Sequence, residues 1–233
     1  MSRRFVPATG FDILLPWYDW LVEPCTNERR MKNRVADEIA SGDMSSVLDV
    51  GCGTGTLLKM LAECSRKRRT AGARDELVGV DIDPRMLRRA AMKLHRHEAG
   101  ETRRSQAPVK WIEGDACKLP FSSDRYSTVV TTLTLHHLQD AEKRLAIAEC
   151  LRVLKPGGRL LLADFAQPAN RLAGLQFLAV RMCDGFDRTK AHLGGGLADL
   201  IRQSGCEDLG EVFAMPSPLG TIRCYRAGKA GEP

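Results

Sequence analysis

The sequence lacks any long uninterrupted apolar run. No stretch reaches the roughly 18 uncharged apolar residues that a membrane span needs. The most apolar early segment, residues 11–22, is interrupted by Asp12, Pro16 and Asp19, so it fits neither a transmembrane helix nor a signal peptide. We therefore expect a cytoplasmic protein without a transmembrane segment. Peripheral contact of the apolar N-terminal segment with a membrane stays open, as does homodimer formation.

Paired cysteine motifs are also missing. The eight cysteines lie far apart and form no CxxC pair: Cys25, Cys52, Cys64, Cys117, Cys150, Cys183, Cys206 and Cys224. This spacing argues against a zinc ribbon or a redox motif, and apolar neighbours are typical of reduced core cysteines. We expect no disulfide framework and no metal site. Spacing alone leaves one alternative open, a thiol-dependent acceptor such as trivalent arsenic held by cysteines that converge in space.

What the chain does contain is ordinary globular composition and a regular alternation of elements. Hydrophobic residues make up 43% and charged residues 27% of its 233 residues, which suits one α/β domain. A first helix ends near Gly42, and the apolar face of a later one is marked by Leu145, Ala148, Leu151 and Leu154. Short apolar strands fall at residues 46–50, 77–80, 109–112, 126–131 and 160–163. This order predicts a doubly wound, mostly parallel sheet with helices on both faces.

The end of the chain follows a different pattern. Residues 209–215 and 221–226 read as strands, and only a short segment rich in proline and glycine joins them. Such a connection suits an antiparallel pair, because a parallel pair needs a long crossover. Helical patterns cover residues 172–182 and 193–204 before this hairpin.

The glycine-rich segment Gly51-Cys52-Gly53-Thr54-Gly55 comes directly after the first strand. In a doubly wound sheet this turn lies at the carboxyl edge, where ligands bind. A dinucleotide fingerprint would need a third glycine at Thr56, and a phosphate loop would need a lysine that is absent. The carboxylate of Asp49 would repel a pyrophosphate but suits a ligand that carries an ammonium and a sulfonium.

Acidic residues end three successive strands. Asp49 precedes the glycine turn, Asp81 ends the second strand, and Asp115 follows the third. A carboxylate at Asp81 can accept both ribose hydroxyls of an adenosine, Ile82 and Met86 can pack against the adenine, and Asp115 can bind an exocyclic amine. Each acid alone could be a helix cap or a surface residue. Three at one sheet edge indicate a nucleoside site.

These motifs, with residues 151–165 (LRVLKPGGRLLLADF), resemble the class I S-adenosylmethionine-dependent methyltransferases. The resemblance covers residues 28–226 and implies a Rossmann-like seven-stranded sheet with an antiparallel last strand. It implies S-adenosyl-L-methionine as cofactor and a single domain: a helical cap (1–42), a cofactor-binding core (43–165), a helical insertion on the substrate side (166–205) and a hairpin (206–227). The predicted cofactor-binding residues are Asp49, Gly51, Cys52, Gly53, Thr54, Gly55, Asp81, Ile82, Met86, Gly114, Asp115, Ala116, Thr132 and Leu133.

Within the class, residues 131–140 (TTLTLHHLQD) and the pair Tyr18-Asp19 are similar to the ubiquinone and menaquinone C-methyltransferases. The motifs that narrow those enzymes to their substrates are not clear here. The resemblance implies a small, hydrophobic or aromatic acceptor, with methyl transfer by in-line displacement. His136 and His137 are the candidate bases. We expect Trp17, Tyr18, His136 and His192 at the acceptor, and apolar residues 5–20 and 175–182 to cover it.

Two other functions stay open. The net charge of +6 makes RNA or protein methylation a candidate function. The basic runs at residues 66–69 and 103–104, however, fall in helix-to-strand loops. Such loops lie at the amino edge of a parallel sheet, away from the cofactor. We therefore expect no nucleic-acid partner. The other alternative is a non-catalytic protein that binds S-adenosylmethionine, which the fold alone does not exclude.

Overall fold

The computed structural model describes residues 26–68, 75–99 and 109–229. No helix in these ranges is long and apolar enough to cross a membrane. In chain order the elements are α2 (Glu28–Ala40), β1 (Ser46–Val50), α3 (Thr56–Arg68), β2 (Glu76–Asp81), α4 (Pro84–Ala99), β3 (Val109–Glu113), β4 (Tyr126–Thr132), the 3-10 helix η2 (Leu135–His137), α5 (Asp140–Val153), β5 (Leu154–Phe165), α6 (Arg171–Asp184), α7 (Lys190–Leu193), α8 (Gly196–Gln203), β6 (Glu207–Ser217) and β7 (Gly220–Gly228).

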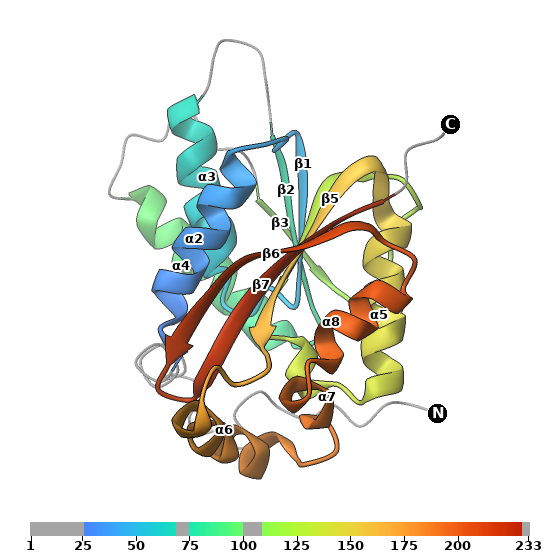
Figure 1. The fold of residues 1–233 in the computed structure, drawn as a ribbon. Coiled ribbons are helices and arrows are strands. Elements are labelled where there is room, and N and C mark those ends of the chain that lie inside the picture. Colours follow the sequence, from blue (N-terminus) through green and yellow to red (C-terminus); the bar gives the residue numbers. More distant parts are fainter. Residues whose placement is uncertain (1–25, 69–74, 100–108, 230–233) are drawn as a thin grey trace.

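The strands form one seven-stranded sheet in the order β3-β2-β1-β4-β5-β7-β6 (Figure 1). Strands β1 to β5 pair in parallel, and β7 runs antiparallel to both β5 and β6. The predicted sheet, with its terminal hairpin and antiparallel last strand, is confirmed. From β1 the chain continues to β2 on one side, and from β4 it continues to β5 on the other. The carboxyl edge between β1 and β4 is the position at which a doubly wound sheet binds its ligand.

Apolar side chains cover both faces of the sheet, which explains why strand β1 is buried at all five positions. Val47 belongs to the core beneath α2 and α3. Leu48 and Val50, pointing the other way, belong to the core beneath α5 and α8. The alternation places Asp49 on the same side as Val47, toward α2.

The predicted apolar face of α5 is confirmed at Leu151 and wrong at Leu145 and Ala148, while Leu154 is buried but begins β5. Leu145 is 50% exposed and Ala148 is also exposed, whereas the helix buries Ile147, Cys150 and Lys143. The Lys143 ammonium can be buried because it donates to Asp140 and to the carbonyl of Arg188. The helix ends at Val153, and strand β5 begins directly after it at Leu154.

The parallel strands end at one edge of the sheet, and α6 and α7 lie across that edge (Figure 1). The described part of the first basic run, Arg66–Arg68, ends helix α3 at the opposite end of the molecule. Residues 66–68 therefore belong to the helix and not to the predicted loop, but they lie away from the glycine turn, as expected. Arg69, Arg103 and Arg104 lie outside the described residues.

Candidate active site

The glycine turn after β1 is open to a ligand at one position. The turn is held to β2, because Gly51 and Cys52 both donate backbone N–H groups to the Val80 carbonyl, at 2.8 and 3.0 Å. Gly51, Gly53 and Gly55 all have positive φ, which side chains rarely tolerate. A Cβ atom on Gly51 would lie 2.3 Å from the Thr134 hydroxyl, whereas a Cβ on Gly53 would meet no atom within 4 Å. Gly53 therefore offers bare backbone to the space in front of the turn.

Gly55 serves helix packing. A Cβ atom there would lie 2.4 Å from the Trp111 ring and 2.8 Å from the Ala90 Cβ. The glycine thus lets the start of α3 approach β3 and α4 closely. Close approach of a helix to its sheet is one of the reasons for glycine in such turns.

Asp49 lies fully buried behind the turn. Neither of its carboxylate oxygens has a hydrogen-bond partner in the described part of the chain. Burial raises the pKa of Asp49 to about 7, although the charge of Lys32 opposes this shift. An unpaired buried carboxylate is costly, so this group is suited to a cation that arrives with a ligand.

Asp81 binds the glycine turn at the end of β2. Its Oδ2 accepts the backbone N–H of Gly53 at 2.8 Å, and its Oδ1 accepts that of Asp83 at 2.9 Å. Burial raises its pKa, while these backbone hydrogen bonds oppose the shift. A carboxylate has about four lone-pair positions, so two of them stay available for hydroxyl groups. Beside it, Ile82 is 44% exposed and Met86 is buried.

Asp115 and its neighbours form a tight turn after β3. The Asp115 Oδ1 accepts the backbone N–H of Cys117 at 2.8 Å, and Asp115 forms an isolated bridge with Lys118. Gly114 lies close to Pro120 and Val80, and Ala116 packs against the core on the α5 side. These residues follow the strand next to β2, so they lie at the same sheet edge as Asp81.

A cavity of about 260 Å³ lies in front of the glycine turn. Of the residues predicted from the sequence, eight line it: Gly51, Cys52, Gly53, Thr54, Thr132, Leu133, His136 and His137. Its outer wall comes from α6, through Ala179, Val180, Cys183 and Asp184, and from Phe165 and Leu219. Thr26, Glu28 and Lys32 of the α2 region complete the lining. The cavity therefore has a polar end at the turn and a more apolar wall under α6.

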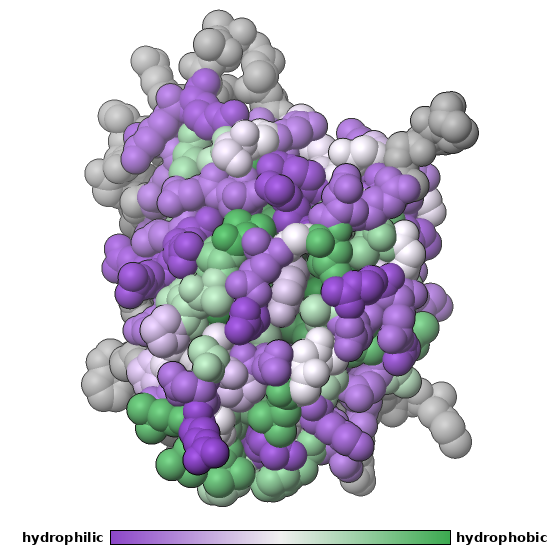
Figure 2. All heavy atoms as spheres, viewed as in Figure 1, coloured by the Kyte–Doolittle hydropathy of each residue, from purple (hydrophilic) through white to green (hydrophobic). Residues whose placement is uncertain are grey.

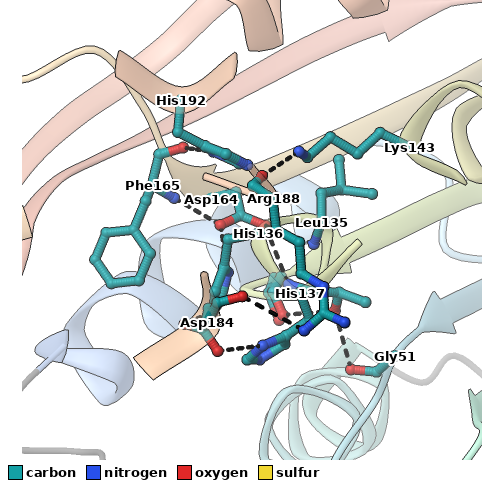
Figure 3. Close-up of polar contacts among 12 residues, drawn as sticks. Gly51, Leu135, His136, His137, Lys143, Asp164, Phe165, Asp184, Arg188 and His192 are labelled. Carbon is teal, nitrogen blue, oxygen red and sulfur yellow. Dashed lines mark hydrogen bonds and ion pairs between the residues drawn. The ribbon is translucent and has the colours of Figure 1, made fainter. Parts of the chain in front are cut away.

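His136 is held by Asp164 on the cavity wall (Figure 3). The His136 Nδ1 lies 2.7 Å from Asp164 Oδ1. Burial would raise the pKa of Asp164, but the charge of His136 and its hydrogen bond hold it well below its usual range. The carboxylate therefore accepts the Nδ1–H and leaves Nε2 free to accept a proton. Burial lowers the pKa of His136, yet the Asp164 charge outweighs it and raises the pKa above its usual value.

His137 forms a second histidine–carboxylate pair. Its Nδ1 lies 2.9 Å from Asp184 Oδ1 at the end of α6. Burial and the adjacent His136 lower the pKa of His137. The Asp184 Oδ2 lies 3.9 Å from His136 Nε2, and the ligating atoms of His136, His137 and Asp184 lie within 4.8 Å of one another. Three such groups could hold a metal ion, although the sequence predicts none here.

His192 lies behind the cavity wall. It is fully buried, its Nδ1 bonds the Phe165 carbonyl, and its ring centroid is 6.4 Å from that of His136. Burial lowers its pKa. It does not line the cavity, unlike His136. Trp17 and Tyr18, predicted at the acceptor, and the apolar segment 5–20 lie outside the described residues.

Sequence comparison with known proteins identifies the family of this chain. Residues 47–158 match a methyltransferase domain family. The demethylmenaquinone methyltransferase of Thermus thermophilus is 33% identical over 187 residues, 79% of this chain and 75% of that protein. A ubiquinone/menaquinone biosynthesis C-methyltransferase of Syntrophotalea carbinolica is 30% identical over 182 residues, 75% of this chain and 70% of that protein. The chain belongs to this methyltransferase family.

Solved structures agree on the fold of the methyltransferase. The magnesium protoporphyrin IX methyltransferase of Synechocystis, solved with bound S-adenosylhomocysteine (SAH), has a TM-score of 0.64 and 20% identity, covering 87% of this chain and 84% of that one. The N-methyltransferase NodS of Bradyrhizobium japonicum, also with SAH, has a TM-score of 0.61 and 19% identity, covering 90% and 91%. The family uses S-adenosylmethionine as its methyl donor.

The cavity and its hydrogen-bonded surroundings contain residues that sequence reasoning missed: Asp164, Asp184, Thr26, Glu28 and Lys32. Asp164 lies one residue before the end of β5, so the rule that singled out Asp49, Asp81 and Asp115 would have found it too. Asp184 ends a helix and carries no such signature. Lys32 and Glu28 form an ion pair at 2.5 Å within the cavity lining, but their spacing of four residues looks like an ordinary exposed helix pair.

Proposed function

We propose that this methyltransferase transfers the methyl group of S-adenosylmethionine to a ring carbon of a hydrophobic hydroxyaromatic acceptor of the quinol class. The observation that carries the proposal is His136, which lines a cavity together with Ala179 and Val180 of α6 and is oriented by a buried carboxylate. The relatives support the acceptor class, since they are a demethylmenaquinone methyltransferase and a ubiquinone/menaquinone biosynthesis C-methyltransferase.

The residues of the glycine turn fit the cofactor. Gly53 lets it approach the backbone, the unpaired Asp49 carboxylate suits its ammonium group, and Asp81 suits its ribose. Asp115 and Ala116 with Ile82 and Met86 would hold the adenine, and Thr132 and Leu133 would border the cavity beside the turn. When bound, S-adenosylmethionine supplies a methyl group activated by a positive sulfur.

His136 would act on the acceptor as a general base. A quinol hydroxyl donates its proton to Nε2, and the resulting phenolate makes the adjacent ring carbon nucleophilic. That carbon would take the methyl group, with the electrons of the carbon–sulfur bond leaving on sulfur to give SAH. The ring proton would then pass to solvent, and the ring oxygen would recover its proton from Nε2. Asp164 stabilises the imidazolium, because its carboxylate lies 2.7 Å from Nδ1. The protein otherwise holds the reactants in line and excludes water.

The rest of the chain supports this assignment. We propose one methyltransferase domain: a cap (1–42), a cofactor core (43–165), a substrate-side insertion (166–205) and a hairpin (206–227), acting in the cytoplasm. RNA methylation is disfavoured because the described basic run, residues 66–68, ends α3 at the sheet edge away from the cavity. A non-catalytic role is disfavoured by the orientation of His136.

Release of SAH tests the proposal. Purified protein is incubated with S-adenosylmethionine and, separately, a short-chain demethylated naphthoquinol, the same compound oxidised, or RNA. We expect SAH and a ring-methylated product with the quinol only. His136→Gln should keep cofactor affinity and lose turnover by about 10²–10⁴-fold. The control is His95→Gln, at an exposed position on α4. If His136→Gln turns over as fast as the native protein, His136 is not the base. Turnover with RNA alone would show that the acceptor is RNA and not a quinol.

A further inference from the structure

Helix α6 has two apolar faces. Ala173, Phe177 and Val180 are buried at a spacing of four and three residues, which places them on one side of the helix. On the other side a second apolar set points outward, and it continues into the loop after the helix. We call this set the outer apolar face: Leu172, Leu175, Leu178, Met182 and Phe186.

Exposed hydrophobic side chains of the described ranges are concentrated on the outer apolar face. Leu175 is 68% and Met182 70% exposed. Of the eight large hydrophobic residues that are exposed in the described ranges, five belong to this face. The others, Ile82, Met92 and Leu145, lie singly on other elements. Figure 2 shows hydrophobic surface gathered at the end of the molecule where Figure 1 places α6. Contiguous apolar patches on a surface mark interaction sites.

Basic residues accompany this face along the chain. Arg171 begins α6, Arg181 lies within it, and Arg188 and Lys190 follow it. The Arg181 guanidinium stacks on the Phe186 ring at 4.5 Å. Residues 171–190 contain two acids. Asp184 pairs with His137 at the cavity, which leaves Asp187 as the exposed acid.

We propose that the outer apolar face docks the enzyme on an anionic lipid bilayer. An amphipathic helix with exposed Leu and Met and flanking Arg and Lys is the form of element that lies in a membrane interface. Basic side chains beside the apolar ones add attraction to anionic headgroups. The bilayer, a partner of stated chemistry, fits both features at once, whereas a neutral apolar partner would leave the basic residues without a counterpart.

The docking proposal rests on the proposed function, because a lipophilic quinol acceptor is what docking on a bilayer would serve. The same helix that carries the outer apolar face lines the cavity with Val180, Cys183 and Asp184. A lipophilic quinol could then pass from the bilayer into the cavity along α6 without crossing water. Docking itself requires no turnover, so the two claims are separable by experiment.

Cosedimentation of the full chain with vesicles tests the docking. Phosphatidylcholine vesicles with and without phosphatidylglycerol are compared for the native protein, for Leu175→Glu and for Met182→Glu. The matched controls are Leu145→Glu on α5 and Met92→Glu on α4, which place the same charge at similarly exposed apolar positions. We expect binding to the anionic vesicles, a fall of roughly tenfold or more in each α6 variant, and native behaviour in both controls.

Other results would overturn the proposal. These are a native protein that does not bind anionic vesicles, α6 variants that bind as tightly as the controls, and a native dimer that the α6 variants dissolve without any vesicle binding. The last result would assign the face to contact between copies of the chain. Turnover of a short-chain quinol without vesicles is measured in parallel. If vesicle binding behaves as expected while turnover is absent, the proposed acceptor fails and the docking stands.

Discussion

Asp164 binds His136 twice. Its Oδ1 accepts from the imidazole Nδ1 at 2.7 Å, and its Oδ2 accepts the backbone N–H of His136 at 3.3 Å. The same Oδ2 also accepts the N–H groups of Thr134 and Leu135, at 3.1 and 2.7 Å. One buried carboxylate at the end of β5 thus fixes both the short helix η2 and the ring of its histidine.

The pair predicts the pH dependence of turnover. His136 must be neutral to accept a proton, and Asp164 raises its pKa above 6.5. We therefore expect kcat/KM to rise with pH to a plateau, with the midpoint of this limb above 6.5. Asp164→Asn removes the charge that favours the imidazolium, so the limb should move to lower pH while kcat falls by about 10²-fold or more. An unchanged limb in Asp164→Asn would show that another group titrates.

Much of this site could be predicted from the chain. The glycine turn and the acids at Asp49, Asp81 and Asp115 follow from short local patterns, because strand ends meet at one edge of a parallel sheet. Asp164 was missed although it also lies near the end of a parallel strand. Asp184 was missed because it lies 47 residues beyond His137, at the end of a helix. The face of α5 was misjudged because Lys143 is buried through a bond to the Arg188 carbonyl, which no helical periodicity reveals.

The buried carboxylate of Asp49 should lower the stability of the ligand-free protein while it strengthens cofactor binding. Its folded pKa, raised by burial to about 7, exceeds the value of 3.8 expected when unfolded. The folded state therefore keeps a proton that the unfolded state releases, and stability falls as pH rises from about 4 to about 7. Asp49→Asn should remove this slope and stabilise the ligand-free protein at pH 8 by roughly 1–4 kcal/mol.

Urea unfolding at pH 5 and pH 8 measures the effect, with exposed Asp199→Asn as the control. The same Asp49→Asn variant should bind S-adenosylmethionine roughly 10- to 100-fold more weakly, since it loses a charge-assisted hydrogen bond. A variant that is less stable at pH 8 would contradict the account of an unpaired buried carboxylate.

Two glycines of one turn should behave differently. Gly53→Ala places a methyl group in open space, so we expect a loss of only about 1 kcal/mol of stability from its positive φ but at least a tenfold loss of cofactor affinity. Gly55→Ala drives a methyl group into Trp111 and Ala90, and should cost roughly 2–4 kcal/mol of stability. Thermal unfolding and cofactor titration of both variants separate the two roles. Equal losses of stability would refute the distinction.

Turnover should be insensitive to metal chelators. The Nδ1 atoms of His136 and His137 are each bonded to a carboxylate, and a base at His136 needs its Nε2 free of a metal ion. We expect the same kcat before and after treatment with a chelator and after addition of Mg²⁺, Mn²⁺ or Zn²⁺. Loss of turnover on chelation, restored by one of these ions, would instead make His136, His137 and Asp184 a metal site.

The central claim is that the glycine turn and the acid at the end of β2 hold S-adenosylmethionine. Calorimetric titration with S-adenosylmethionine and SAH tests it most directly, on the native protein, on Asp81→Ala and on Glu207→Ala as an exposed control. The account predicts micromolar binding to the native and control proteins and a loss of about tenfold or more in Asp81→Ala. Folded native protein that binds neither ligand, or an Asp81→Ala variant that binds both as well as the control does, would contradict it.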